Sequence, residues 1–316
     1  MEFHPLIEVD PSLLTDLLAE ERRDWIEELS WDPGEVQQLI LRYVGQRLLP
    51  GFAAFEEGRA VGYTYYLTRD LVGILGTLYL VRTHRRHQAV VDLLTTTLDC
   101  LRRFSRIDRL EAQIFPFGID LIPAFAHFGF KYYRRHYLRK FLSDFPAANS
   151  PGVLHKQQSF RLMPWTEELV DGAAIVIQSG YAGSIDREIC SEYASYTSCL
   201  VFLRNLVSNP GCGKFLPQAS FMILDENELL SGVILVSQLS AATALIAQIS
   251  VLPGYQGLGL GSLLMDRAFT ALKELGYSQV CLSVSEQNQR AYTWYQQIGF
   301  QRYQELMAFV WHGQAA

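Results

Sequence analysis

The sequence predicts an α/β protein that contains two copies of one unit in tandem. A buried strand at residues 244–251 is followed by a loop with glycines at 257, 259 and 261, and then by an amphipathic helix at residues 262–275. The same order of elements occurs 170 residues earlier in the chain. The length of 316 residues also favours two domains over one.

The first half is predicted to open with two helices, the first capped by Ser12, and to continue with strands and helices. The expected elements are helices at residues 12–29 and 35–48, strands at 52–56, 60–68 and 72–81, a helix at 88–104, a strand at 109–114 and a short helix ending near residue 127. Pro, Ser, Asn and Gly then accumulate in residues 142–152, which is a linker composition. We therefore expect domains at residues 1–145 and 158–316, with a linker at 146–157.

The second half is predicted to repeat this order. The expected elements are a strand at residues 159–163, helices at 166–178 and 187–207, strands at 219–224, 232–236 and 243–251, the helix after the glycine loop, and strands at 279–284 and 301–310. Several matching residues support one ungapped offset of 170. They are Gly62 and Gly232, Val81 and Val251, Arg86 and Gln256, Phe125 and Tyr295, and the motifs Phe-Gly-Phe at 128–130 and Ile-Gly-Phe at 298–300.

Composition argues against a membrane span and against a disulfide framework. No apolar run reaches 18 residues, and the first residues do not resemble a signal peptide. The five cysteines are widely spaced and the seven histidines are scattered, so we expect reduced thiols, no metal and a cytoplasmic location.

Charge is unevenly distributed along the chain, although the net charge is only −6. Residues 1–35 have a balance of −9 and residues 82–140 a balance of +7. One interpretation is that the acidic segment lies across the basic one and neutralises it. The other is a basic surface for an anionic partner, but the overall acidity makes nucleic acid an unlikely partner.

The glycine loop predicts an anion site. A strand, a loop of alternating glycines and a helix start expose unpaired backbone N–H groups and the positive end of a helix dipole. A dinucleotide fold needs the glycine motif directly after the strand, but residues 252–257 intervene here. The Lys-Ser/Thr pair of a phosphate-binding loop is also absent from this segment.

Two motifs resemble those of the GNAT N-acetyltransferase superfamily. The acyl-CoA signature Arg/Gln-x-x-Gly-x-Gly/Ala is matched by residues 256–261, Gln-Gly-Leu-Gly-Leu-Gly. Downstream, residues 288–300 match Asn-x-x-Ala-x-x-Trp-Tyr-x-x-x-Gly-Phe. The resemblance covers nearly all of the second copy and, more weakly, most of the first. It implies two GNAT-like domains, each a mixed, mostly antiparallel sheet flanked by helices.

The resemblance also implies acetyl transfer from acetyl-CoA to an amine. Tyr295 matches the position of the general acid that protonates the leaving thiolate, although it could also be a buried structural tyrosine. Asn288 matches a position that contacts the CoA arm, although it could also cap a helix. Trp294 is interpreted as a core residue. The expected CoA-binding residues are Ile249, Ser250, Val251, Gln256, Gly257, Leu258, Gly259, Leu260, Gly261, Ser262, Asn288 and Tyr295.

The general base is less evident in the sequence. Gln248 stands where many relatives have a glutamate, and it cannot accept a proton. A water held by Gln248 and Ser285 is one solution, and a carboxylate of Asp186, Glu188 or Glu192 is another. If residues 187–207 are one helix, Glu188 and Glu192 share a face of it. Of these residues, we take Gln248 and Glu192 as catalytic candidates beside Tyr295.

The first copy lacks the features that the resemblance makes chemically meaningful. It has His87, Ala89 and Val91 in place of the three glycines, and Phe125 in place of the tyrosine. Side chains at 87 and 91 would obstruct a pyrophosphate. The alternative is that Arg82, Arg85 and Arg86 bind a phosphate through their side chains. We expect one active site, in the second copy.

The predicted function is acyl-CoA-dependent N-acyl transfer to a small-molecule or peptide amine by direct attack in a ternary complex. The acceptor pocket is expected to be shaped by the first copy and by loops 180–186 and 209–217, and the chain is expected to be a monomer or homodimer. A non-catalytic acyl-CoA sensor and an aminoacyl-tRNA-dependent transferase remain alternatives.

Overall fold

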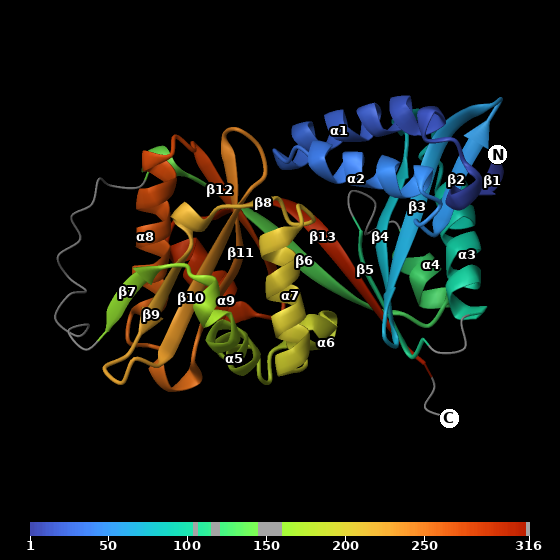
Figure 1. Ribbon diagram of the computed structural model, residues 1–316. Helices are drawn as coiled ribbons and strands as arrows, with labels where there is room; N and C mark the ends of the chain where they lie inside the picture. The colour runs from blue at the N-terminus through green and yellow to red at the C-terminus, as the bar shows by residue number, and fades with distance from the viewer. Residues whose placement is uncertain (104–106, 115–120, 145–159, 314–316) are drawn as a thin grey trace. The chain divides into compact units, whose positions relative to one another are not determined.

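A computed structural model of the protein describes residues 1–103, 107–114, 121–144 and 160–313 (Figure 1). The chain forms two compact units. Unit 1 contains residues 1–136 and 304–316, and unit 2 contains residues 137–303. Both boundaries fall inside strands, so a division of the chain at one linker does not describe these units. The predicted linker at 146–157 lies outside the described residues.

Unit 1 has two helices before its main strands. Its elements are β1 (Glu2–Pro5), α1 (Thr15–Leu29), α2 (Gly34–Gly45), β2 (Gly51–Glu56), β3 (Arg59–Arg69), β4 (Val72–Leu80), α3 (His87–Arg103), β5 (Arg109–Ile114), α4 (Ile122–His127) and the start of β6 (Lys131–Phe141). The prediction that Ser12 caps the first helix was wrong. Asp10 instead accepts the Ser12 N–H at 2.9 Å and caps a short 3-10 turn that precedes α1.

Unit 2 repeats this order, with α6 and β8 as additional short elements. Its elements are β7 (Arg161–Pro164), α5 (Val170–Gly180), α6 (Ile185–Ile189), α7 (Tyr196–Ser208), β8 (Lys214–Phe215), β9 (Phe221–Leu224), β10 (Leu230–Gln238), β11 (Thr243–Val251), α8 (Leu260–Glu274), β12 (Gln279–Ser285), α9 (Gln289–Gln297) and the start of β13 (Gln301–His312). The sheet order is β6-β12-β11-β10-β9-β7. From β7 to β11 the neighbouring strands are antiparallel, whereas β11 and β12 are parallel.

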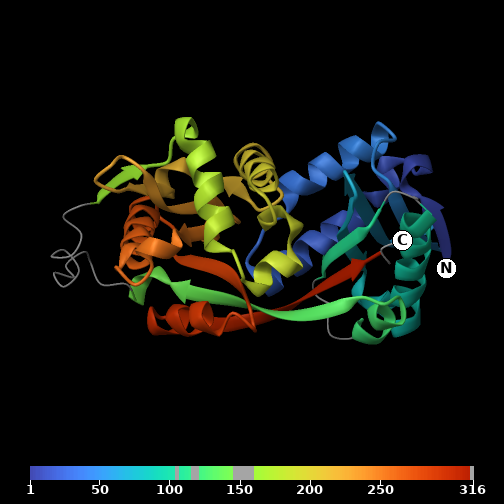
Figure 2. The ribbon, with the colours of Figure 1, turned by 90° about the horizontal axis from the view of Figure 1, so that it is seen from below.

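The last strand of each copy extends into the sheet of the other unit. β6 and β13 begin at residues 131 and 301, so they are equivalent under the repeat of 170 residues. The end of β13 pairs antiparallel with β5 of unit 1, from Met307 opposite Ile114 to His312 opposite Arg109. The end of β6 lies next to β12 in unit 2. Both strands can be followed in Figure 2, β6 in green and β13 in red.

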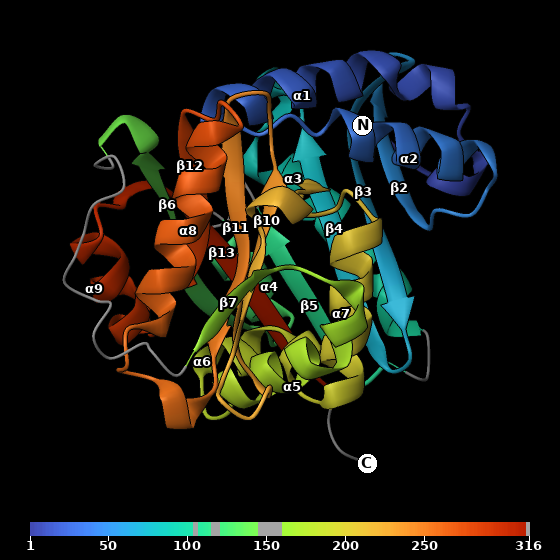
Figure 3. The same cartoon turned by 60° about the vertical axis from the view of Figure 1, so that its left-hand side comes forward.

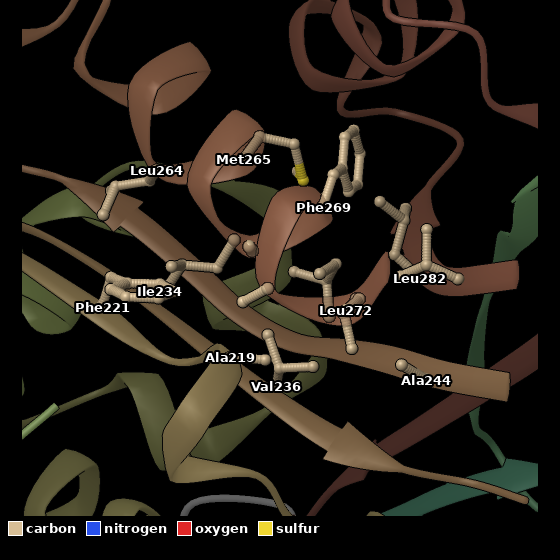
Figure 4. Packing of buried hydrophobic residues seen from close by; sticks show 14 of the residues in the cluster. Ala219, Phe221, Ile234, Val236, Ala244, Leu264, Met265, Phe269, Leu272 and Leu282 are labelled. Atoms are coloured by element: carbon tan, nitrogen blue, oxygen red, sulfur yellow. The ribbon is translucent and has the colours of Figure 1, made fainter. Parts of the chain in front are cut away.

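The sheet of unit 2 has an apolar core on each face. One core packs α8 and α9 against alternate residues of β9–β12, and Figure 4 shows Phe269 and Leu272 of α8 on the side of Ile234 and Val236 of β10. The other core packs α5 and α7 against the opposite residues of β9 and β10. Figure 3 lets the reader trace α8 beside β11 and β12. Burial on both faces explains why β10 is apolar along most of its length.

The strands β11 and β12 separate after a short pairing. They pair in parallel only from Thr243 opposite Gln279 to Leu245 opposite Cys281. A β-bulge in β11 opposite Leu235 and Val236 follows directly, and bulges bend the strand that contains them. The rest of β11 therefore has one backbone edge that β12 does not cover.

In unit 1, the acidic first helix neutralises part of the basic stretch. Asp24 of α1 is buried and accepts from Arg82 Nε at 2.7 Å through Oδ1, and it also pairs with Arg85. Arg82 further contacts Glu27 at 2.8 Å. These ion pairs support the interpretation that the acidic segment at residues 1–35 neutralises the basic stretch at residues 82–140. Within the described residues, no helix is long and apolar enough to cross a membrane.

Candidate functional site

The loop before α8 presents bare backbone amides. Gly257 and Gly259 have φ values of 82° and 87°, in the left-handed region that favours glycine. Gly259 is the N-cap of α8, and no described side chain caps this helix start. The first N–H groups of an α-helix, here those of residues 260–262, have no partner inside the helix.

Packing within the described chain does not require a glycine at position 257. A Cβ at this position would meet no described atom within 4 Å. The space in front of the residue is therefore open to a ligand. A ligand that binds the neighbouring N–H groups needs that space, because a side chain would hold it away from them.

The uncovered edge of β11 supplies further backbone groups. Leu252 N–H donates to Ser231 O of β10, so the N–H groups of Ile249 and Val251 face the opposite edge. Two groups on that edge already have partners. Ile249 N–H donates to Gln248 Oε1 at 3.0 Å, and Gln256 Nε2 donates to Val251 O at 3.1 Å. A ligand that uses the Ile249 N–H must therefore displace the side chain of Gln248.

Gln248 is buried at 2% exposure and holds an aromatic residue of the loop after α5. Tyr181 donates its hydroxyl to Gln248 Oε1 at 2.8 Å, and its ring stacks on Tyr193 at a centroid distance of 4.2 Å. Among the described atoms, Gln248 Nε2 has no hydrogen-bond partner. The amide cannot act as a base, so its visible role is to position Tyr181. A water held between Gln248 and Ser285 stays a prediction.

Tyr295 lies on α9 with its side chain mostly buried, at 8% exposure. Its ring packs against Phe300 in a T-shaped contact with a centroid distance of 5.8 Å. Burial and, secondarily, the charge of Asp186 raise the pKa of this hydroxyl well above its usual value near 10. Tyr295 is protonated at neutral pH, as an unperturbed tyrosine would be, and its burial makes the hydroxyl a weaker acid than usual.

Asp186 and Asn288 form a polar network at the start of α9. Ser285 Oγ donates to Asp186 Oδ1 at 2.5 Å, and Asn288 Nδ2 donates to Asp186 Oδ2 at 3.0 Å. Ser184 Oγ also donates to Oδ2, at 3.1 Å. Asn288 Oδ1 accepts the Ala291 N–H at 3.3 Å and thus caps α9. Asn288 is therefore a helix cap whose amide group is oriented by Asp186.

These elements line a cavity of about 1180 Å³ in unit 2. All of the predicted CoA-binding residues except Leu258 line this cavity. They are Ile249, Ser250, Val251, Gln256, Gly257, Gly259, Leu260, Gly261, Ser262, Asn288 and Tyr295. Leu258 is instead 40% exposed. A further wall is the loop from Ser179 to Ile185, part of the predicted acceptor loop, together with Glu188. Gly180 approaches β11 so closely that a Cβ would overlap Ser250 Oγ.

The catalytic candidates Gln248 and Glu192 are not among the residues that line this cavity. Glu192 lies in a separate 3-10 turn, where its carboxylate accepts from the Cys190 thiol at 3.5 Å. The single helix predicted at 187–207 was wrong, because Cys190 is extended, with φ −125° and ψ 110°. Glu188 and Glu192 therefore do not share a helix face. Among the described residues that line the cavity, Glu188 has the only carboxylate.

Arg290 is a site residue that the sequence analysis missed. It is exposed, lines the cavity, and donates from Nη1 to Gln256 Oε1 at 2.9 Å. No other described lining residue has a cationic side chain. A positive charge therefore stands beside the glycine loop, where Gln256 alone supplies none. The signal was present in the sequence, since Arg290 lies in the first turn after Asn288, but the motif match gave this position no role.

The open amides, the positive helix end and Arg290 fit the diphosphate of coenzyme A. The uncovered edge of β11 fits an extended arm that bonds to backbone groups. In the described chain, no group of three or more His, Cys, Asp or Glu could hold a metal ion.

In the corresponding region of unit 1, an arginine and a phenylalanine have partners within the unit itself. Arg85 Nε donates to Leu80 O at 2.9 Å, and Asp24 pairs with that arginine. Phe125 is fully buried and stacks on Phe309 at a centroid distance of 3.8 Å. The alternative was that Arg82, Arg85 and Arg86 bind a phosphate, and it loses support because carboxylates engage Arg82 and Arg85, two of the three.

Comparison with known proteins identifies the class of domain. Residues 191–300 match the family model described as the acetyltransferase (GNAT) family. The chain is similar to N-alpha-acetyltransferase 30 of Schizosaccharomyces pombe, with 27% identity over 31% of this chain and 67% of that protein. It is also similar to the [ribosomal protein bS18]-alanine N-acetyltransferase of Haemophilus influenzae, with 35% identity over 25% of this chain. The chain spans about half of the latter protein, 51%.

Solved structures show the same fold over the whole chain. A tandem GNAT protein from the clavulanic acid biosynthesis pathway has a TM-score of 0.66 at 16% identity, and the match covers 100% of this chain and 99% of that one. A GCN5-related N-acetyltransferase from Sphaerobacter thermophilus has a TM-score of 0.68 at 14% identity, with 98% and 95% covered. Residues 191–300 therefore match the acetyltransferase (GNAT) family, and the chain as a whole has the fold of a tandem GNAT protein.

Proposed function

We propose that unit 2 transfers an acetyl group from acetyl-CoA to a primary amine by direct attack in a ternary complex. The observation that supports this proposal is that Gly257, residues 259–262 and Tyr295 line one cavity. An anion-binding loop and a proton donor thus line the same space. Acetyl-CoA, when bound, supplies the acetyl group as a thioester.

The chain's own residues supply the binding and orientation that this reaction needs. The amides of residues 257–262 and Arg290 hold the diphosphate of the donor. The free edge of β11 orients the pantetheine arm through backbone hydrogen bonds. Displacement of the Gln248 side chain from the Ile249 N–H would accompany binding, since that amide is occupied in the free protein.

Two side chains supply the proton transfers in this proposal. Tyr295 holds a proton at its hydroxyl for the leaving sulfur. Glu188 has the only carboxylate among the described lining residues, and it is the base that we propose for the incoming ammonium group. The amine then attacks the thioester carbonyl, the carbon–sulfur bond breaks, and the leaving thiolate takes the proton of Tyr295. The amine nitrogen loses its second proton as the amide forms, and that proton restores the Tyr295 hydroxyl.

The acceptor class is suggested by the names of the relatives. The two similar proteins are named as an N-alpha-acetyltransferase and as an enzyme that acetylates an alanine of a ribosomal protein. Peptides with a free α-amino group are therefore the first acceptors to try. Small-molecule amines are the second set, because one protein with the same tandem fold belongs to the clavulanic acid biosynthesis pathway.

The test is release of free thiol from acetyl-CoA in the presence of peptide and small-amine panels. Wild type should release thiol with at least one panel. Tyr295→Phe should bind acetyl-CoA in a thermal-shift assay but turn over far more slowly. Binding without turnover in both proteins would instead favour an acyl-CoA sensor, and a thermal shift that needs tRNA would favour an aminoacyl-tRNA-dependent transferase.

A further inference from the structure

We propose that Asp186 is a positioning residue that couples the loop wall of the cavity to Tyr295. This inference rests on the proposed function, but it concerns a residue that lies outside the two GNAT motifs at residues 256–261 and 288–300. Its basis is one buried carboxylate that joins the loop at Ser184 to the end of β12 and the start of α9, whose residues Ser285 and Asn288 lie 99 and 102 positions away.

The first step is the geometry of the carboxylate. Asp186 is 5% exposed, and its two oxygens accept hydrogen bonds from Ser184, Ser285 and Asn288. Ser184 belongs to the loop that lines the cavity, Ser285 ends β12, and Asn288 begins α9. A carboxylate engaged in this way is poorly placed to take a proton from an amine.

Asn288 links Asp186 to the proton donor Tyr295. Asn288 caps α9 through Oδ1 while its Nδ2 is held by Asp186, so the carboxylate fixes which way the amide points. Tyr295 lies on that same short helix, about two turns further on. Loss of Asp186 should therefore displace the start of α9 and, with it, the hydroxyl. A shift of about 1 Å at a reacting group can cost on the order of 10²-fold in rate.

Combining Asp186→Ala with Tyr295→Phe separates this positioning role from that of a general base. If Asp186 acts through Tyr295, then Asp186→Ala lowers kcat on the order of 10²-fold in wild type but little further in a Tyr295→Phe background. If Asp186 is the base, the two losses multiply.

The conservative variant gives a second readout. In Asp186→Asn the amide oxygen can still accept from Asn288, while its NH₂ group can donate to Ser285, whose hydroxyl is free to rotate. This variant keeps the shape of the network, so it should retain most of the activity that Asp186→Ala loses. A general base would not be replaced by an amide, and the two variants would then be equally inactive.

The experiment measures kcat, KM and the dissociation constant of CoA for these variants, together with their melting temperatures. Ser220→Ala is the control, because Ser220 is fully buried in unit 2, its hydroxyl takes part in two hydrogen bonds, and the residue is not among those that line the cavity. We expect Ser220→Ala and Asp186→Ala both to lower the melting temperature. Only Asp186→Ala should lower kcat, and it should do so in wild type but hardly in the Tyr295→Phe background.

Multiplicative losses would overturn the proposal, as would an Asp186→Ala variant with wild-type kcat. If no acceptor is found, the dissociation constant of CoA remains a readout, because Asn288 lines the cavity and should move when Asp186 is lost. An unchanged dissociation constant in Asp186→Ala would then contradict the coupling, whereas failure to find an acceptor bears only on the proposed function.

Discussion

The two units share an order of elements but differ in what occupies the loop before the long helix, α3 or α8. In unit 2 the loop between β11 and α8 is open, with Gly257 and Gly259 in left-handed conformations. In unit 1 the loop between β4 and α3 carries Arg82 and Arg85, and both pair with Asp24. A carboxylate of the chain itself thus occupies a loop whose counterpart has room for an anion. The comparison teaches that a few loop residues, and not the order of elements, distinguish the open loop of unit 2 from the neutralised loop of unit 1.

The largest expected effect comes from removing the proton donor of unit 2, Tyr295. Unit 1 has Phe125 at the equivalent position and therefore has no hydroxyl there. Tyr295→Phe should lower kcat by about 10³-fold, because general acids typically contribute 10²- to 10⁴-fold. The dissociation constant of CoA should change little. Tyr292→Phe, on the same helix, is the control and should keep wild-type kcat. Steady-state kinetics compare the two variants, and equal activity would remove Tyr295 from the mechanism.

The next effect concerns a buried acid of unit 1 and its dependence on pH. Burial raises the pKa of Glu21 to about 7, partly offset by hydrogen bonds from Gln37 and Tyr63. Because this pKa lies above the usual 4.5, Glu21 keeps its proton in the folded state between about pH 4.5 and 7, whereas the unfolded chain releases it in that range. The resulting stabilisation is fully present below pH 4.5 and is lost as pH rises through 7, by about 3 kcal/mol.

Glu21→Gln should remove this pH dependence and raise the free energy of unfolding at pH 8, where wild type carries a buried charge. Urea denaturation at pH 5 and pH 8 measures it, with Glu57→Gln in an exposed turn as the control. The same change in unfolding free energy between the two pH values for wild type and Glu21→Gln would show that Glu21 titrates normally.

A smaller effect tests the neutralised loop of unit 1. Asp24→Asn should cost about 2 kcal/mol of stability, because it leaves two arginines and the Tyr79 hydroxyl without their carboxylate. Glu27→Gln should cost less than about 1 kcal/mol, since that carboxylate is exposed. Urea denaturation measures both. Neither change should alter CoA binding; a second CoA site in Asp24→Asn would mean that the carboxylate had been blocking a functional loop.

The smallest effect is expected at the glycine loop of unit 2. Gly257→Ala should weaken CoA binding on the order of tenfold, comparable to one lost hydrogen bond, because the methyl group intrudes on the amides. Gly276→Ala is closely matched, since Gly276 also has a positive φ, 86°, and also has no described atom within 4 Å of an added Cβ. Both variants should lose about 1 kcal/mol of stability. Calorimetric titration that shows the same CoA affinity for both variants would contradict the account of the loop.

Most of the fold was predictable, because hydrophobic periodicity and glycine punctuation are local signals. The loop and helix at residues 252–275 and the repeat of 170 residues are confirmed in outline. The exchange of β6 and β13 was not predictable, because the two strands are equivalent and either copy could accept either strand. The break at Cys190 was also missed, since nothing in the local sequence of residues 187–207 marks it.

The site was predictable where a motif names consecutive residues, and not where side chains meet from distant positions. Asp186 bonds to Ser285 and Asn288, which lie 99 and 102 positions away. Sequence analysis could therefore propose Asp186 only as one carboxylate among three. Arg290 was overlooked for a similar reason, because its contact with Gln256 spans 34 positions.

The most direct test of the central claim is a crystal structure of the protein with CoA. The account predicts one molecule per chain, with its diphosphate against the N–H groups of residues 257–262. Density for the cofactor beside Arg82 and Arg85 of unit 1, or at any place away from Gly259, would contradict it.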